Sequence, residues 1–493
     1  MNRSYKAFIN GKWQDAESGM TTPVINPANG KIIAYVAKCG VADLEMAVEA
    51  AHDAGLAWAA TPVGERSKVL LKASRLIMER QQELAELETL EHGSPLRKTM
   101  NFDVPLCAEQ LEYFAGAARA MTGDSIPVGP WCLSTTVHEP LGVVGLITPW
   151  NFPAMMVIWK LGAALVTGNT CVVKPPSIAP LTALKLGEIF TEAGAMPGVV
   201  NVVPGPGAEI GEALVRHPRV AKIGFTGDTV TGKRIMAMAS ETVKPVGLEL
   251  GGKNAFLVLE DADVDAAVEG AVFGAFFNSG QVCAAASRFY IHEKIYDTFA
   301  EKFIAATKGL CYGDPMKMET AMGPVAYAGH RDKIEAYIDG AKKSGATLLL
   351  GGERPQTPDT RDGFFVAPTI FGECDHTAQF MQEEIFGPVV GLCRFQDIDQ
   401  AIDMVNDSPF GLAASIWTGD GSKGVALAGR IKAGTVWINE HLIIFCDTPW
   451  GGCKASGWGK DLSKMVLEEY TMIKHIYMDI SGKASKPWYD ILK

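Results

Sequence analysis

The sequence predicts an α/β protein with two doubly wound parallel sheets, and three observations support this fold class. From residue 142 onward, short apolar strands alternate with amphipathic helices, which is the pattern of a parallel sheet covered on both faces. Gly251 and Gly252 interrupt the alternation, and a second series of strands and helices follows them. The chain has 493 residues, more than one domain of roughly 100–200 residues accommodates.

The first 120 residues precede this alternation and contain strands followed by helices. Residues 8–13 are expected to form a short edge hairpin. Apolar residues recur at helical spacing over residues 43–60 and 65–91, and one helix is expected in each range. His92 and Gly93 are expected to end the second of these helices.

Two alternating series follow. Pro153 opens the first helix of the first series, a position at which the missing N–H of proline costs little. In this series strands are expected at residues 143–148, 170–174, 199–203 and 220–226, and helices at residues 153–167, 180–193, 208–216 and 229–240. The second series is expected to contribute strands at residues 254–259, 288–292, 388–395, 413–418 and 434–439, and a helix at residues 263–278.

Composition and charge exclude several classes of protein. Apolar residues make up 47% of the chain, which excludes a disordered polymer. The 45 basic and 56 acidic residues leave a net charge of −11, so no nucleic-acid partner is expected. The most apolar stretch, residues 155–166, is too short to span a bilayer, and the N-terminus carries no apolar signal segment. A cytoplasmic protein without a membrane partner is therefore expected.

The ten cysteines form neither a disulfide framework nor a zinc site. None belongs to a Cys-x-x-Cys pair or lies at zinc-ligand spacing from a histidine, so no metal is expected. Most of them are expected to be reduced, buried, apolar side chains. Cys283 differs, because it follows the Gly280 turn at the end of the helix at residues 263–278, where a thiol can be exposed.

Two glycine-rich loops follow predicted strands. The loop at residues 205–211 approaches the dinucleotide-binding fingerprint, but its last glycine comes one residue late, and a simple tight turn is an equally good interpretation. The loop at residues 225–232 places Gly227 before a helix N-terminus. Free N–H groups and the helix dipole favour a phosphate at such a position.

Three further segments place reactive side chains near strand ends. Asn151 follows a strand and can donate a hydrogen bond to a developing oxyanion. Glu249 lies in an apolar run, where burial raises the pKa of a carboxyl toward values useful for a general base. Glu384 supplies another carboxylate just before a strand. Each residue alone is more simply structural, but together with Cys283 they indicate one reactive site.

With these motifs the chain resembles the NAD(P)-dependent aldehyde dehydrogenase superfamily, and in detail it is most similar to the betaine-aldehyde and aminoaldehyde dehydrogenase branch. The resemblance runs from about Phe8 to Tyr477 and depends on seven motifs in the order of the family. They are Pro-Trp-Asn at 149–151, Lys-Pro at 174–175, Phe-Thr-Gly at 225–227, Glu-Leu-Gly-Gly-Lys at 249–253, Gly-Gln-x-Cys at 280–283, Glu-Ile-Phe-Gly-Pro at 384–388 and Pro-Trp-Gly-Gly at 449–452.

The resemblance implies an aldehyde dehydrogenase-like fold with a Rossmann-like cofactor domain, a catalytic domain and a small oligomerisation sheet. Residues 1–120 and 142–251 would form the NAD(P)-binding domain, and residues 252–453 would form the catalytic domain that carries the nucleophile. Residues 121–141 and 466–493 would form the oligomerisation segment. A homodimer or homotetramer is expected on the same ground.

The resemblance also implies a mechanism that oxidises an aldehyde to its acid. Cys283 would attack the aldehyde, and Asn151 with the Cys283 backbone N–H would hold the oxyanion of the thiohemiacetal. Hydride transfer to the nicotinamide would leave a thioester, which water activated by Glu249 would hydrolyse. Relatives that pass the acyl group to coenzyme A generally lack this glutamate, so a non-acylating enzyme is expected. Lys160 and Asp461 lie where the family often relays protons near this base.

For NAD(P), the resemblance assigns Lys174 to the adenine-ribose hydroxyls and Glu384 to the nicotinamide ribose. The further residues implied in cofactor binding are Trp150, Ser177, Gly207, Gly211, Phe225, Thr226, Gly227, Gly232 and Phe386. Ser177 stands where NAD-selective relatives have a glutamate that repels a 2′-phosphate, so NADP use is expected beside NAD. Asp228 stands where many relatives have a pyrophosphate-binding serine, and it would repel phosphate unless it caps the helix.

Four aromatic residues are expected to line the aldehyde tunnel: Phe152, Trp159, Phe277 and Trp450. In the betaine-aldehyde branch aromatic rings at these positions surround a quaternary ammonium, so a betaine or amino aldehyde is one expected substrate. An apolar tunnel for aromatic or medium-chain aldehydes is the alternative. A cysteine hydrolase or thioesterase is an alternative of another class, but none of the motifs supplies the histidine base it would need beside Cys283.

Overall fold

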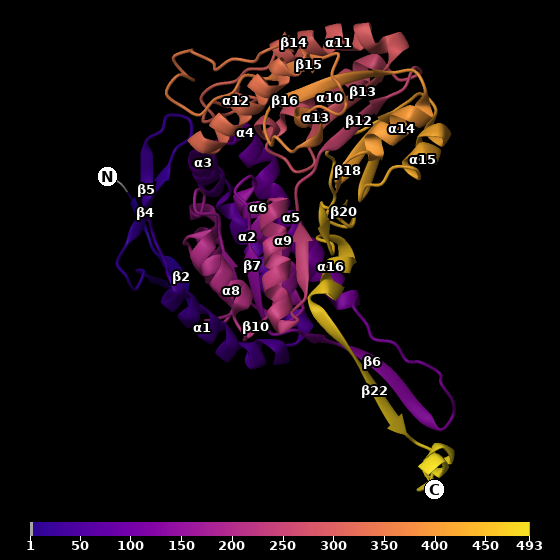
Figure 1. Cartoon of the computed structure of the whole chain (residues 1–493). Coiled ribbons are helices and arrows are strands. Elements are labelled where there is room, and N and C mark those ends of the chain that lie inside the picture. The colour runs from indigo at the N-terminus through magenta and orange to yellow at the C-terminus, as the bar shows by residue number, and fades with distance from the viewer. Residues whose placement is uncertain (1–2, 493) are drawn as a thin grey trace.

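The computed structural model of the chain describes residues 3–492 and contains the two predicted sheets, which are parallel except for antiparallel strands at their edges (Figure 1). The first sheet has eight strands in the order β21-β11-β10-β7-β8-β9-β2-β3. Its strands are β2 (Ala7–Ile9), β3 (Lys12–Gln14), β7 (Val143–Ile147), β8 (Thr170–Lys174), β9 (Val200–Val202), β10 (Val220–Thr226), β11 (Val246–Glu249) and β21 (Gly457–Trp458). The predicted hairpin at residues 8–13 is confirmed as the β2–β3 edge of this sheet.

The second sheet has seven strands in the order β14-β15-β16-β13-β12-β18-β19. Its strands are β12 (Asn254–Val258), β13 (Ala286–His292), β14 (Thr347–Leu350), β15 (Thr369–Gly372), β16 (Val389–Phe395), β18 (Ala413–Trp417) and β19 (Thr435–Ile438). The sequence prediction missed β14 and β15, the edge pair. The chain passes from β11 of the first sheet to β12 of the second through the glycines at 251 and 252.

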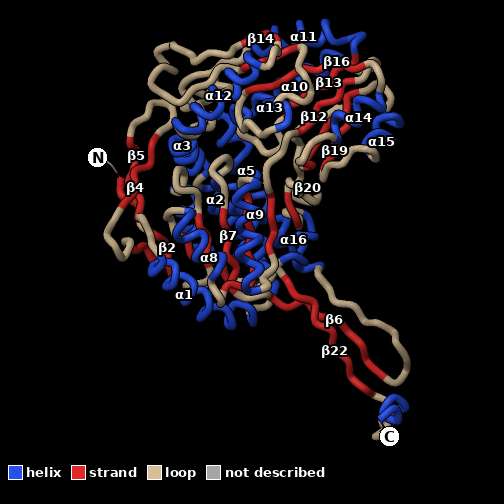
Figure 2. Tube along the Cα trace, viewed as in Figure 1, coloured by secondary structure: helices blue, strands red, loops and turns tan. Residues whose placement is uncertain are grey.

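Both faces of each sheet are buried. Along β7, Val144 and Leu146 belong to one core cluster, whereas Val143 and Ile147 belong to another on the opposite face. The same alternation holds along β12 between Leu257 and its neighbours. Helices cover the strands on both sides (Figure 2), as a doubly wound fold requires.

Helices are present in all the predicted ranges, and the structure adds others. The longer ones are α1 (Val41–Ala60), α5 (Val104–Ala117), α6 (Pro153–Val166), α7 (Leu181–Ala193), α9 (Thr229–Ala239), α10 (Val264–Phe276), α11 (Glu293–Lys308) and α12 (Ala328–Lys343). The shorter ones are α4 (Leu96–Lys98), α8 (Glu212–Arg216), α13 (Gln379–Gln382), α14 (Ile398–Asn406), α15 (Gly421–Ala428) and α16 (Ser463–Glu469). Of these helices, α4, α5 and α11–α16 were not predicted. Helix α6 is buried along its whole length, which matches its uniformly apolar sequence.

Three helix predictions were wrong in detail. The expected helix at residues 65–91 is two helices, α2 (Val63–Glu79) and α3 (Gln81–His92), because the backbone of Arg80 leaves the helical region at φ −106° and ψ 20°. Helix α10 ends at Phe276 rather than residue 278, because Asn278 and Ser279 take left-handed conformations at φ 52° and 57°. The helix expected at residues 208–216 begins with a wide π-type turn and is regular only over α8.

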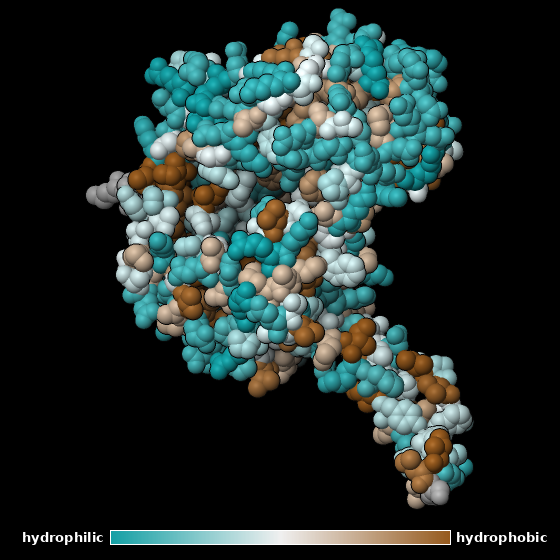
Figure 3. Space-filling model, viewed as in Figure 1, coloured by the Kyte–Doolittle hydropathy of each residue, from teal (hydrophilic) through white to brown (hydrophobic). Residues whose placement is uncertain are grey.

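In the described part of the chain, three smaller sheets accompany the two large ones, and the shortest is the pair β17 (Phe410–Gly411) and β20 (Cys453–Lys454). Strands β1 (Arg3–Tyr5), β4 (Thr21–Ile25) and β5 (Ile32–Ala37) form another of them. Strands β6 (Cys132–Pro140) and β22 (Thr471–Asp479) pair antiparallel along their whole length and project from the body as an arm (Figures 1 and 3). We call this pair the β6–β22 arm. Among residues 3–492, no helix is long and apolar enough to cross a membrane.

Candidate active site

The carboxyl ends of β7, β8, β10 and β11 open into a cavity of about 780 Å³ that reaches the loop before β13. Sixteen of the residues implicated by the sequence line this cavity. They are Trp150, Asn151, Phe152, Trp159, Lys174, Ser177, Gly207, Phe225, Thr226, Gly227, Glu249, Phe277, Cys283, Glu384, Phe386 and Trp450. Gly211 and Gly232 do not line it, and a side chain at Gly232 would run into Leu250. That glycine therefore serves close packing of α9 in this structure.

Cys283 lies on the loop between α10 and β13. The turn before it depends on Gly280, which has a φ of 70° and whose missing side chain leaves room for the Gly387 carbonyl. Burial, followed by the nearby Glu384 and Glu249 carboxylates, raises the pKa of the Cys283 thiol to about 12. The thiol is consequently protonated at rest at neutral pH.

Asn151 lies beside this loop with its side chain held in place. Its Nδ2 donates a hydrogen bond of 3.0 Å to the Gln281 carbonyl, and the Asn278 Nδ2 donates one of 2.9 Å to the Asn151 carbonyl. An amide nitrogen carries two hydrogens, so the second N–H of Asn151 remains able to donate into the cavity. This is the geometry required of an oxyanion donor.

Glu249 ends β11 and is 5% exposed. Neither of its carboxyl oxygens has a hydrogen-bond partner among residues 3–492. Burial, reinforced by Asp461, raises the pKa of Glu249 well above its usual value, and Lys160 and Lys460 oppose this rise. The Lys160 ammonium pairs with the Asp461 carboxylate at 2.5 Å in a nearly water-free position. A buried carboxyl with free lone pairs and a raised pKa is suited to accept a proton from water.

Other side chains of the cavity are arranged for a ligand with hydroxyl and phosphate groups. Burial lowers the pKa of the Lys174 ammonium at the end of β8 to about 8. The buried Thr226 hydroxyl has no partner. Glu384 accepts a 2.9 Å hydrogen bond from the Gly252 N–H, and burial raises its pKa to about 7. A buried ammonium, a free hydroxyl and a carboxylate in one cavity form a donor and acceptor set that fits a dinucleotide.

Asp228 caps α9. Its carboxylate accepts hydrogen bonds from the N–H and the hydroxyl of Thr231, at 2.9 and 2.6 Å. The capping alternative considered from the sequence is thus the observed one. The Ser177 hydroxyl donates to the Gly205 carbonyl at 3.0 Å. Because residue 177 is a serine, it contributes no carboxylate to this rim of the cavity.

The sequence analysis missed several cavity residues, which lie in segments without a recognisable motif. The N-terminal part of α12 and the residue before it contribute Tyr327, His330 and Lys333. His330 contacts the Phe386 carbonyl through Nε2 at 2.7 Å, where Phe386 has a φ of 62°. Tyr327 and His330 also pack edge-on against Trp150. They therefore hold the two aromatic residues expected beside the nicotinamide.

The four predicted tunnel residues form two pairs. Phe152 and Phe277 lie 6.3 Å apart between ring centroids, and Trp159 and Trp450 lie 6.5 Å apart. The sequence also did not indicate that the Lys98 ammonium lies 4.2 Å from the centroid of Phe152. Lys98 is buried and pairs with Asp103. A cation therefore already occupies one face of a ring that the prediction assigned to substrate.

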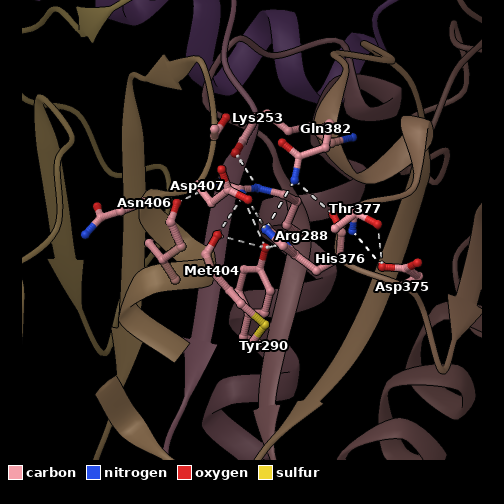
Figure 4. A network of polar contacts seen from close by, with 12 residues as sticks. Lys253, Arg288, Tyr290, Asp375, His376, Thr377, Gln382, Met404, Asn406 and Asp407 are labelled. Carbon is pink, nitrogen blue, oxygen red and sulfur yellow. Dashed lines mark hydrogen bonds and ion pairs between the residues drawn. The ribbon is translucent and has the colours of Figure 1, made fainter. Parts of the chain in front are cut away.

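A second polar network, next to the cavity, supports the segment that carries Glu384 (Figure 4). The buried Arg288 guanidinium donates to the carbonyls of Lys253, Met404 and Val405. It also donates to the Tyr290 hydroxyl, which contacts His376 at 2.8 Å. This network fixes the start of residues 375–386 against β13.

The comparison with known proteins agrees with this geometry. The sequence profile of the aldehyde dehydrogenase family matches residues 13–476. The chain is 41% identical to the betaine aldehyde dehydrogenase of Bacillus subtilis (strain 168), covering 99% of this chain and 100% of the relative. It is 39% identical to the chloroplastic betaine aldehyde dehydrogenase of Beta vulgaris, covering 98% of each.

The fold is similar to solved structures as well. A point mutant of betaine aldehyde dehydrogenase from Staphylococcus aureus, crystallised with NAD+, superposes with a TM-score of 0.95 at 39% identity. The match covers 98% of this chain and 99% of that one. Sequence similarity and fold similarity therefore indicate the same family.

Proposed function

The chain belongs to the aldehyde dehydrogenase family, and we propose that it oxidises its aldehyde to the carboxylic acid through a thioester on Cys283. The observation that carries this proposal is that Cys283, Asn151 and Glu249 share one cavity in which Glu249 has no hydrogen-bond partner. A nucleophile, an oxyanion donor and a free base are the three groups that the two-step reaction needs.

In the first step, the Cys283 thiol gives its proton to solvent water, and its sulfur forms a bond to the aldehyde carbon. The carbonyl π bond breaks, and the resulting oxyanion receives hydrogen bonds from Asn151 and the Cys283 backbone N–H. A bound NAD(P)+, held through its riboses by Lys174 and Glu384, would supply the acceptor for the hydride that leaves the aldehyde carbon. The carbonyl then re-forms, and the acyl group remains on Cys283 as a thioester.

In the second step, Glu249 takes a proton from a water molecule as the water oxygen bonds to the thioester carbon. The C–S bond breaks, and the Cys283 thiolate and the carboxylic acid are released. The buried Lys160–Asp461 pair lies beside Glu249 and offers a route by which its proton returns to solvent. This arrangement supports hydrolysis of the thioester rather than transfer of the acyl group to coenzyme A.

We propose NAD+ as cofactor, with NADP+ also accepted. The Staphylococcus aureus relative was crystallised with NAD+, and Lys174 and Glu384 here supply a donor and an acceptor for its two riboses. Ser177 places no negative charge at the rim where a 2′-phosphate would lie. The proposal assigns cofactor binding to residues 1–120 and 142–251, and the nucleophile to residues 252–453.

For the substrate, we propose a betaine or amino aldehyde. The Trp159–Trp450 pair offers two aromatic faces to an onium group. Glu109, at the exposed edge of the same cavity, forms no ion pair within residues 3–492 and would attract a cation. The Lys98 ammonium against Phe152 favours the second candidate, an aromatic or medium-chain aldehyde, because it removes one ring face from cation binding.

We further propose that the protein is a homodimer or homotetramer assembled through the β6–β22 arm. Residues 121–141 and 466–493 contain this arm. Ile473 on β22 is 64% exposed and Met472 is 51% exposed, on an arm that projects away from the two large sheets in Figure 1. A second copy of the chain would bury these side chains.

Initial rates with a panel of aldehydes against NAD+ and NADP+ test the proposal. Betaine aldehyde and 4-aminobutyraldehyde should show a lower KM than neutral aldehydes of equal length, and Cys283→Ala should abolish NADH formation. Better turnover of benzaldehyde would support the second candidate instead. Cofactor-independent ester hydrolysis without aldehyde-dependent NADH formation would indicate the hydrolase class and reject the proposal.

A further inference from the structure

A chain of buried hydrogen bonds leads from the turn after α3 to the oxyanion donor. The Ser94 hydroxyl donates to Asn278 Oδ1 at 2.7 Å, and Asn278 Nδ2 donates to the Asn151 carbonyl at 2.9 Å. Ser94, Asn278 and Asn151 are 1%, 2% and 4% exposed, respectively. This series of hydrogen bonds thus joins three segments that are far apart in sequence, and its residues are buried from solvent.

The donors and acceptors in this chain can be assigned uniquely. Asn278 Oδ1 can only accept, so the single hydroxyl proton of Ser94 is directed to it. The Lys98 ammonium donates to the same hydroxyl oxygen at 3.2 Å, and His92 Nδ1 lies 2.8 Å from it. Since the Ser94 proton is already used, His92 must carry its proton on Nδ1. Its Nε2 then needs no proton, in agreement with its lack of a partner.

The backbone of Asn278 has an unfavourable left-handed conformation, and the hydrogen bonds of its side chain help to hold it there. It has a φ of 52°, and the following Ser279 has a φ of 57°, so two consecutive residues other than glycine are left-handed. Such residues persist where the surrounding contacts hold them. The Asn278 amide bridges Ser94 and Asn151, whereas the Ser279 hydroxyl donates away from the site, to the Gly323 carbonyl.

We infer that Asn278, anchored by Ser94, is a positioning residue for the oxyanion hole. Its amide holds the Asn151 backbone against the Cys283 loop, whose Gln281 carbonyl in turn receives the Asn151 side chain. His92, in the same turn as Ser94, stacks on Trp150 at 5.8 Å and fixes the residue before Asn151. Neither Ser94 nor Asn278 lines the cavity, so both act through Asn151.

This inference rests on the proposed function, because it assigns a role in the same oxyanion hole. Loss of a donor from such a hole lowers kcat by about 10²–10³-fold, and misplacement by about 1 Å can cost roughly 10²-fold. A displaced Asn151 should therefore lower kcat by about 10- to 100-fold, while the KM for NAD+ stays within about threefold.

The test compares Asn278→Gly with Asn278→Ala. Glycine accepts the left-handed backbone but removes the side-chain bridge, whereas alanine removes the bridge and strains the backbone as well. Both variants should lose kcat for aldehyde oxidation and for hydrolysis of p-nitrophenyl acetate, which needs Cys283 and the oxyanion hole but no hydride transfer. Ser279→Gly is the matched comparison in the same turn and should change both rates by less than threefold.

Ser94→Ala and Ser94→Thr provide a second pair if the Asn278 variants fold poorly. The threonine variant keeps the hydroxyl and should retain most activity, whereas the alanine variant should lose about tenfold in both reactions. Full activity of Asn278→Gly in both reactions would overturn the inference. A loss confined to aldehyde oxidation would also overturn it, because the network would then position the nicotinamide and not the oxyanion donor. A wild-type protein without aldehyde-dependent NADH formation would instead reject the proposed function, and ester hydrolysis would still test the positioning.

Discussion

Replacement of Glu249 by glutamine should separate the two halves of the proposed reaction. The two side chains have nearly the same shape, and neither Glu249 oxygen makes a hydrogen bond that the substitution would break. A buried carboxyl is costly to charge, so the neutral amide should leave the free energy of unfolding within about 1 kcal/mol of the wild type. General-base catalysis contributes about 10²–10⁴-fold, and hydrolysis of the thioester should slow by that factor.

Acylation should persist in Glu249→Gln. The Glu249 carboxylate raises the pKa of Cys283, so its removal favours the thiolate. Stopped-flow measurement at 340 nm should therefore show a burst of about one NADH per site, followed by a steady state about 10²–10⁴-fold slower than that of the wild type. Mass spectrometry of the acid-quenched protein should find the acyl group on the Cys283 peptide. A steady-state rate within tenfold of the wild type, or no acyl adduct, would refute the assignment of Glu249 as the base for water.

Three further substitutions test the cofactor site, the nucleophile and the arm. Ser177→Glu should raise the KM for NADP+ about 30-fold with little change for NAD+, because a carboxylate near a doubly charged phosphate costs about 2 kcal/mol in water; equal rises for both cofactors would contradict this. Glu384→Gln removes a charge that raises the Cys283 pKa. The pH profile of Cys283 alkylation by iodoacetamide should therefore move to lower pH, and an unchanged profile would contradict this effect of Glu384. Ile473→Glu places a charge on the β6–β22 arm and should yield smaller particles in light scattering, with an unchanged molar mass arguing against the arm as the interface.

Asn151 was predictable from the sequence because it follows a predicted strand, whereas the sequence analysis singled out Glu249 from an apolar run and did not predict β11, the strand that it ends. Asn151 follows β7 and Glu249 ends β11, and these strands flank β10 in the same sheet. The carboxyl ends of parallel strands lie on one edge, so residues about 100 positions apart meet there without any knowledge of the loops. The glycine at 280, with its positive φ, marked the turn that presents Cys283.

Other parts of the site had no such signal. His330 and Tyr327 reach the cavity from α12, which packs on the second sheet and carries no turn glycine or strand end at the point of contact. Lys98 does not line the cavity, and it reaches Phe152 from α4, which follows the turn that ends α3 at Gly93. Their positions depend on how helices far apart in the sequence pack together. The periodicity of apolar residues along the sequence does not show this packing.

The titratable groups of the cavity share one physical feature, which ties its chemistry to ligand binding. Burial is the first cause of every resolved shift among them, and each shift favours the neutral form: the pKa rises for Cys283, Glu249 and Glu384 and falls for Lys174. In the free protein these four groups are therefore held toward their neutral forms. Charged forms gain partners only when a substrate or cofactor supplies the opposite charge or a hydrogen bond. Burial thus couples the ionisation of the reactive groups to occupancy of the cavity.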